Sequence, residues 1–147
     1  MKAAHIVVGS AVLVLFGVTG LWGAWRWYRA EPSQLFWRLL RTSQVVLLIQ
    51  ILLGGILLAE GKKPGSLHVL YGLLPLAVSF VGEQLRISSA EMVLASAGFE
   101  SAAEVGELSP EEQQSIVLSI LRRELGVMAL AALVILGLAA RAAMTAG

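Results

Sequence analysis

The sequence predicts an all-α polytopic membrane protein, an antiparallel bundle of four transmembrane helices. Apolar residues make up 57% of the 147-residue chain and charged residues only 14%, compared with roughly 25% charged residues in soluble domains. The charged residues lie between long apolar segments instead of being scattered through them. The alternation of apolar and polar residues that is typical of a transmembrane barrel strand is missing from the sequence. Helices, which satisfy their own backbone in lipid, are therefore expected.

Four segments of the chain are apolar enough to cross a membrane, which takes roughly 20 residues of helix. The expected transmembrane spans are residues 6–25, 39–59, 67–85 and 125–140. The first span carries no charged residue, and the third includes Glu83 close to its end. Because the first two connections are short, successive helices are expected to be antiparallel neighbours in one membrane domain that covers residues 1–147.

The first span also has to be weighed against a cleaved signal peptide, since Lys2 provides a basic residue before it. However, its apolar run is long for a signal peptide, and Arg26 and Arg29 follow it without a small-residue cleavage site before them. The sequence therefore favours a retained helix.

Lys and Arg residues are divided unequally between the two sides of the expected membrane domain. One side holds Arg26, Arg29, Arg38, Arg41, Arg86, Arg122 and Arg123, and the other holds Lys2, Lys62, Lys63 and Arg141. Because the more basic side of a membrane protein faces the cytoplasm, the third connection is expected there and both chain termini are expected outside. The expected location is the plasma (inner) membrane, which the chain crosses several times.

The third connection, residues 87–115, differs in composition from the spans, with six Glu and no Lys or Arg. A short amphipathic helix is expected to begin at Ser88 or Ser89 as N-cap and to end before Gly98. A second helix is expected to begin at the Ser-Pro pair of residues 109–110 and to continue into the fourth span. This cytoplasmic helical segment is interpreted as a docking surface or a lid, or alternatively as a connector that lies on the lipid headgroups.

Composition and motifs exclude several classes of function. The chain has no cysteine, which excludes disulfides, thiolate metal sites and Cys nucleophiles. A formal net charge of +1 does not favour a nucleic-acid partner, which would need clustered Lys and Arg. No Ser-His-Asp constellation, phosphate-binding loop or zinc-protease motif is present in the sequence.

The chain has only two histidines, His5 and His68. Both begin helices that start at the outer surface, and these helices are diagonal neighbours on the order of 14 Å apart. That separation suits two imidazoles that bind one haem iron from opposite sides, because His is a common axial ligand and bundles build cofactor sites from inward side chains. The alternatives are histidines that only hydrogen-bond water or headgroups, and a two-His zinc site with Glu60 as the only nearby carboxylate.

Small residues recur on the first two helices, at Gly9, Gly17, Gly20, Gly23, Gly54 and Gly55. They allow either ordinary close packing of helices or the approach of a flat cofactor, and Gly54 and Gly55 are assigned to the cofactor site. Pro75 leaves the carbonyl of Tyr71 without its helical donor, which places Tyr71 in the same expected site. Gln50, expected near mid-membrane, is interpreted as a cofactor contact or, alternatively, as an interhelical hydrogen bond.

The stretch QILLGG, followed by a polar turn and a His at the start of the next helix, resembles the haem A synthase family from Gln50 to Leu76. The resemblance implies that His68 is an axial haem ligand near the outer face. The paired ligand of that family lies on the helix before the glutamine helix, a position that only His5 fills here. The chain has one bundle where the family has two, no acidic residue beside His5 and no outer-loop cysteines. Oxidation of a haem methyl group is therefore not expected.

Together these observations predict a small integral membrane protein that holds one b-type haem for electron transfer or haem handling, and they leave enzymatic activity open. The alternative is a non-enzymatic membrane subunit or assembly factor that docks partners through its acidic cytoplasmic segment and Gly-rich helix faces. A small transporter ranks last, because the first, second and fourth spans carry no carboxylate. Besides the lipid bilayer, the expected partners are another membrane protein or a second copy of the chain, which would pair two His68 residues.

Overall fold

The computed structural model describes residues 1–146 and is all-α, with no strand among these residues. The helices are α1 (Lys2–Tyr28), α2 (Gln34–Ala59), α3 (Ser66–Ser96), α4 (Ala102–Val105) and α5 (Pro110–Met144). All except α4 are long and apolar enough to cross a membrane, which confirms the prediction of four apolar helices with the length of a span. Pro75 does not interrupt α3, which continues on both sides of it.

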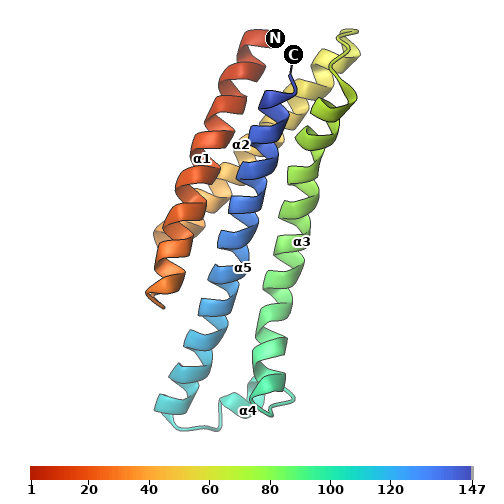
Figure 1. Ribbon diagram of the computed structural model, residues 1–147. Coiled ribbons are helices and arrows are strands. Elements are labelled where there is room, and N and C mark those ends of the chain that lie inside the picture. The colour runs from red at the N-terminus through yellow and green to blue at the C-terminus, as the bar shows by residue number, and fades with distance from the viewer. Residues whose placement is uncertain (147) are drawn as a thin grey trace.

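Successive long helices run in opposite directions, and α5 lies between α1 and α3 (Figure 1). The helix α5 packs along both of these neighbours, and α2 packs along α1. In contrast, α2 and α3 touch only sparsely. Both ends of the chain and the α2–α3 turn lie at the same end of the molecule (Figure 1). This end of the molecule is called the terminal end.

Glycines bring α1 close to its neighbours. A Cβ atom at Gly20 would lie 2.6 Å from Leu133 Cδ2, and a Cβ at Gly126 would lie 2.6 Å from Trp27 Nε1. Gly23 is enclosed in the same way by the ring of Phe36 from α2 and by α5. These distances are too short for a real Cβ atom, so the glycines fix how closely the helices pack. Two of the recurring glycines thus serve helix packing.

The buried residues form two clusters, one on each half of the packed helices. The first contains Val12, Phe16, Leu47, Ala132 and Ile135, and the second contains Phe36, Leu40, Leu125, Met128 and Ala129. Both draw on α1 or α2 together with α5, and neither includes a residue of α3. Helix α3 instead approaches α5 through Gly82, where a Cβ would lie 3.1 Å from Ala131 Cβ.

A polar network joins α2 to α3 far from the terminal end. Glu83 forms ion pairs with Arg41 of α2 and with Arg86, whose Nε lies 2.9 Å from Glu83 Oε2. Gln44 Nε2 donates to Glu83 Oε1 at 3.0 Å and to Ser79 Oγ at 3.1 Å. The Glu83–Arg86 pair is therefore part of a larger link, which joins two helices that share little direct contact.

Three connections follow helices that end in the same backbone motif. The residues at positive φ are Ala30 (52°), Gly61 (80°) and Gly98 (85°). After α3, the Gly98 N–H donates to Ala95 O at 3.2 Å and the Phe99 N–H donates to Leu94 O at 2.9 Å, which is the hydrogen-bond pattern of a Schellman motif. The predicted end of this helix before Gly98 is confirmed.

The start of α5 matches the sequence prediction. Ser109 Oγ accepts from the Glu112 N–H at 3.4 Å, and Glu112 Oε2 accepts from the Ser109 N–H at 3.1 Å, with Pro110 at the first helical position. This reciprocal capping box satisfies two backbone donors. The hydrogen bonds from Ser109 also hold the pKa of the Glu112 carboxyl below its ordinary value.

The third connection, residues 87–115, is largely helical as predicted, but its first helical part continues α3 and does not form a separate helix. Ser88 and Ser89 do not cap a new helix: Ser89 is buried inside α3, where its Oγ donates to Leu85 O at 2.9 Å. This prediction was wrong because the backbone stays helical through both serines. Helices α3 and α5 continue past the ends of α1 and α2, and α4 closes the tip (Figure 1). This projection is called the hairpin.

Replacement of Ala30 by Gly should stabilise the protein by about 0.5 to 1 kcal/mol, because Ala30 holds a left-handed conformation that penalises a Cβ atom. The matched change Gly61→Ala at the equivalent position of the α2–α3 turn should destabilise by about 1 kcal/mol. Thermal unfolding of both variants in detergent measures the two shifts. A lower midpoint for Ala30→Gly would contradict the strain assigned to Ala30.

Candidate functional site

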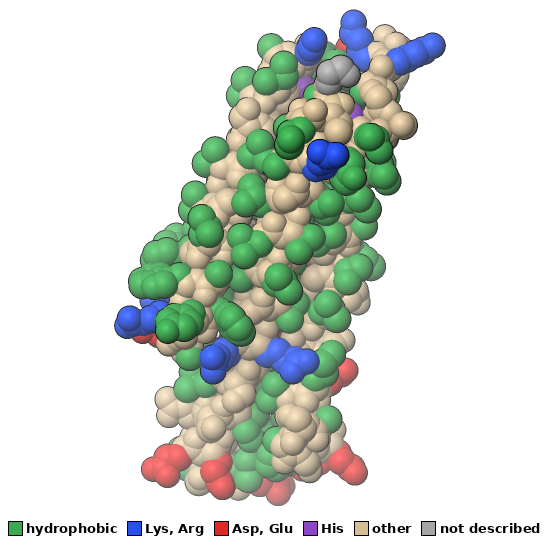
Figure 2. All heavy atoms as spheres, in the orientation of Figure 1, with side chains coloured by type: hydrophobic (Ala, Val, Ile, Leu, Met, Phe, Trp, Pro, Cys, Tyr) green, Lys and Arg blue, Asp and Glu red, His purple; other side chains and the backbone are tan. Residues whose placement is uncertain are grey.

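The two histidines come together at the terminal end, although 62 residues of chain lie between them. His5 lies in the first turn of α1 and His68 in the first turn of α3. Their ring centres are 6.1 Å apart and their planes make an angle of 65°. Figure 2 shows histidine side chains, partly covered by their neighbours, near this end. The two half-buried rings thus meet although α1 and α3 are not among the helix pairs that pack extensively.

His68 is held by the end of α5. Its Nδ1 lies 2.9 Å from the carbonyl oxygen of Ala142, which accepts the Nδ1 proton. This hydrogen bond fixes the tautomer and leaves Nε2 as the nitrogen with a lone pair. The same arrangement orients His side chains that bind metals in other proteins. Ala142 is buried, so the contact lies inside the packed helices.

His5 is held by α2. Its Nε2 lies 3.2 Å from Gln50 Nε2, so the amide donates to a neutral imidazole. The opposite atoms of the two groups, His5 Nδ1 and Gln50 Oε1, are buried without a hydrogen-bond partner within residues 1–146. A buried polar atom without a partner costs about 1–3 kcal/mol. The His5–Gln50 pair therefore has an unused capacity to bind a further group.

Gln50 of α2 contacts His5 of α1. Because His5 lies in the first turn of α1, this contact places Gln50 near the start of that helix, and the expected position of Gln50 near mid-membrane stays a prediction. Its interpretation as an interhelical hydrogen bond is confirmed by this contact. The contact to a cofactor, the other interpretation, stays a prediction.

Two glycines make room for the His5–Gln50 pair. A Cβ at Gly54 would lie 3.4 Å from His5 Cε1, and a Cβ at Gly9 would lie 2.9 Å from Gln50 Nε2. Gly55, also predicted for the site, is exposed and has no atom within 4 Å of such a Cβ in the described chain. Consecutive residues of a helix point in directions about 100° apart, so only one residue of the Gly pair can face His5.

Tyr71 lies one turn after His68 on α3. The guanidinium carbon of Arg141 is 5.9 Å from the centre of the Tyr71 ring, within the range of a cation–π contact. Arg141 precedes the residue whose carbonyl holds His68. The predicted residues His5, Gln50, Gly54, His68 and Tyr71 thus lie in one region, to which three helices contribute them.

Sequence reasoning missed two parts of this site. The carbonyl of Ala142 has no sequence signal, because any residue type supplies one. Gly9 had a usable signal: it lies four residues after His5, and residues at that spacing share a helix face. No group of three or more His, Asp or Glu side chains with metal-binding geometry occurs within residues 1–146.

No protein-family model, curated protein or solved structure matches this chain.

The neighbouring glycines allow a matched test of this geometry. Gly54→Leu should displace the His5 ring and increase its modification by diethyl pyrocarbonate severalfold, because the new side chain would occupy the space beside Cε1. Gly55→Leu should leave the modification of His5 unchanged, since its side chain would point away from the protein. Mass spectrometry of the His5 peptide after brief treatment gives the rates. Equal rates in the two variants would contradict the placement of His5 against Gly54.

Proposed function

We propose that the chain is a small integral membrane protein that binds one b-type haem between His5 and His68, for electron transfer or haem handling. The observation that carries the proposal is the 6.1 Å separation of the two ring centres. A metal–imidazole bond is about 2 Å long, so two imidazoles that share one metal have ring centres roughly 6 Å apart. The pair has this spacing while each ring is held by a separate helix.

The remaining residues of the site support a haem over a bare metal ion. A structural zinc ion takes four protein ligands, whereas a haem brings four nitrogens of its own and needs only two axial ligands. The described chain offers two histidines and no third ligand beside them. The small residues Gly54 and Ala142 flank the rings, which fits a flat group.

The roles of the protein groups follow from their hydrogen bonds. His68 would bind through Nε2 with its ring orientation set by the Ala142 carbonyl. Gln50 would hold His5, and rotation of its amide would let Oε1 accept a hydrogen bond from the imidazole N–H. Bound haem would supply a one-electron iron couple. The sparse contact between α2 and α3 would give a flat group a way to the rings from the side.

The proposal includes a membrane arrangement in which the four long helices span the bilayer as an antiparallel bundle. Exposed apolar side chains cover the outside of these helices, among them Val14, Val45, Leu52 and Phe80. The basic collar, defined as Arg26, Arg29, Arg38, Arg41, Arg86, Arg122 and Arg123, lies where α1 and α2 are joined and would mark the cytoplasmic surface. The terminal end with its histidines would then face outside.

The visible spectrum tests whether the protein binds haem through His5 and His68. Protein purified in detergent from cells supplied with a haem precursor should show a sharp Soret band, and split alpha and beta bands after reduction with dithionite. His5→Ala and His68→Ala should each remove the low-spin spectrum and lower the haem-to-protein ratio at least about tenfold. A colourless protein that also fails to bind added haem would sink the proposal.

Two glutamines on α2, Gln50 and Gln44, provide a matched test of whether Gln50 orients His5 for haem binding. Gln50→Leu should weaken haem binding about tenfold, because it removes the group that orients His5. Gln44→Leu removes a similar interhelical hydrogen bond near Glu83 and should leave haem binding unchanged. Titration of both variants with haem, followed at the Soret band, measures the difference.

Single cysteines test the membrane arrangement, since the natural chain has none. A membrane-impermeant maleimide should label Ser66→Cys in intact cells and Ser101→Cys only after permeabilisation. Val14→Cys, on the lipid-facing side of α1, should react poorly in both states. Labelling of Ser101→Cys in intact cells would reverse the proposed orientation.

A further inference from the structure

The tip of the hairpin carries an open groove. Its lining residues are Glu91, Leu94, Ala95, Gly98, Phe99 and Glu100. The groove is a consequence of the Schellman motif that ends α3: the positive φ of Gly98 reverses the chain, and the Phe99 N–H bonds back to Leu94 O at 2.9 Å. A Schellman motif typically brings the side chains at its two ends, here Leu94 and Phe99, into contact. The floor of the groove is therefore apolar.

Two of the lining residues, Glu91 and Glu100, carry carboxylates. Glu91 is exposed on the last turns of α3, and Glu100 is exposed just after the turn. Neither side chain is among the ion pairs of the described chain. Residues 87–121 as a whole contain six Glu and no Lys or Arg, and Figure 2 shows acidic side chains gathered at this end. Apolar residues next to two carboxylates that form no ion pair in the described chain fit a ligand with apolar and cationic groups.

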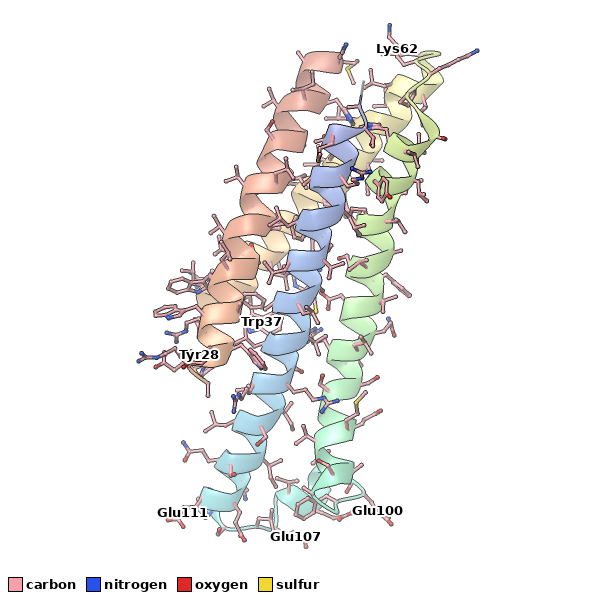
Figure 3. All side chains as sticks on the ribbon, in the orientation of Figure 1. Tyr28, Trp37, Lys62, Glu100, Glu107 and Glu111 are labelled. Atoms are coloured by element: carbon pink, nitrogen blue, oxygen red, sulfur yellow. The ribbon has the colours of Figure 1, made fainter. Side chains whose placement is uncertain are left out.

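Two occupants are disfavoured by charge. A second copy in the same membrane would present its own acidic tip at the same height, so the two tips would repel each other. Lipid headgroups would meet the basic collar, which lies between the apolar part of the helices and the hairpin (Figure 2). Figure 3 places Glu100, Glu107 and Glu111 at the far end of the hairpin from Lys62.

We infer that this groove docks a basic amphipathic helix of a partner protein. An apolar side chain of that helix would pack on Leu94 and Phe99, and its Lys or Arg side chains would pair with Glu91 and Glu100. Docking an amphipathic helix in an apolar groove is a common mode of recognition. Carboxylates at the rim of such a groove add specificity and speed association.

A synthetic helix tests the inference without a known partner. The probe is a labelled Leu/Lys peptide of about 18 residues with all Leu on one helix face, added to the full chain in phosphatidylcholine nanodiscs. Empty nanodiscs correct for binding to lipid. A peptide of the same composition in scrambled order, without an apolar face, should bind at least about tenfold more weakly.

Matched charge variants locate the binding site. The double variant Glu91→Gln/Glu100→Gln should raise the Kd of the Leu/Lys peptide about tenfold, and Phe99→Ser should weaken binding as well. The double variant Glu107→Gln/Glu111→Gln removes the same charge from the same tip outside the groove and should change the Kd less than about threefold. Circular dichroism confirms that each variant stays helical. Equal weakening by the two double variants, or no binding to the natural chain, would overturn the inference.

Discussion

The close approach of α1 and α5 is the constraint on which the rest of the structure depends. Gly20, Gly23 and Gly126 leave no space for a Cβ where these helices and Phe36 meet. Interlocking of this kind fixes the depth of α1 relative to α5 as well as their separation. That depth decides which residues share a level at the terminal end. It places His5 beside the end of α5, where Ala142 holds His68.

Different interactions link α2 and α3 at the two ends of the molecule. Apolar packing between these helices is slight, and neither buried cluster includes a residue of α3. At the end with the basic collar, the Glu83 carboxylate joins α2 to α3 through Arg41, Gln44 and Arg86. At the terminal end, α2 and α3 are linked through α1: His5 contacts Gln50 of α2 and the ring of His68 of α3. Two buried polar atoms, His5 Nδ1 and Gln50 Oε1, have no hydrogen-bond partner there within residues 1–146. Glu83 thus has several hydrogen-bond partners at the end with the basic collar, whereas His5 and Gln50 at the terminal end each have a polar atom that could bind a further group.

The terminal end and the hairpin tip are separated by the length of α3. A group that binds at the histidines would lie near one membrane surface, while a protein at the hairpin would lie beyond the other. Any coupling between the two sites would have to be transmitted through α3 and α5, which are continuous helices across that distance (Figure 1).

The sequence by itself determined the helices. Apolar length fixed four helices able to span a membrane, the Ser109–Glu112 pattern fixed the start of α5, and Gly98 fixed the end of α3, because these depend on local backbone chemistry and composition. The same local reasoning failed at Ser88 and Ser89, where the backbone stayed helical. Only the tertiary structure decided that Gln50 lies level with His5, that Gly54 and not Gly55 faces that ring, and that the Ala142 carbonyl holds His68. These facts depend on how far each helix slides and rotates against its neighbours, and that is set by side-chain packing between segments far apart in the chain.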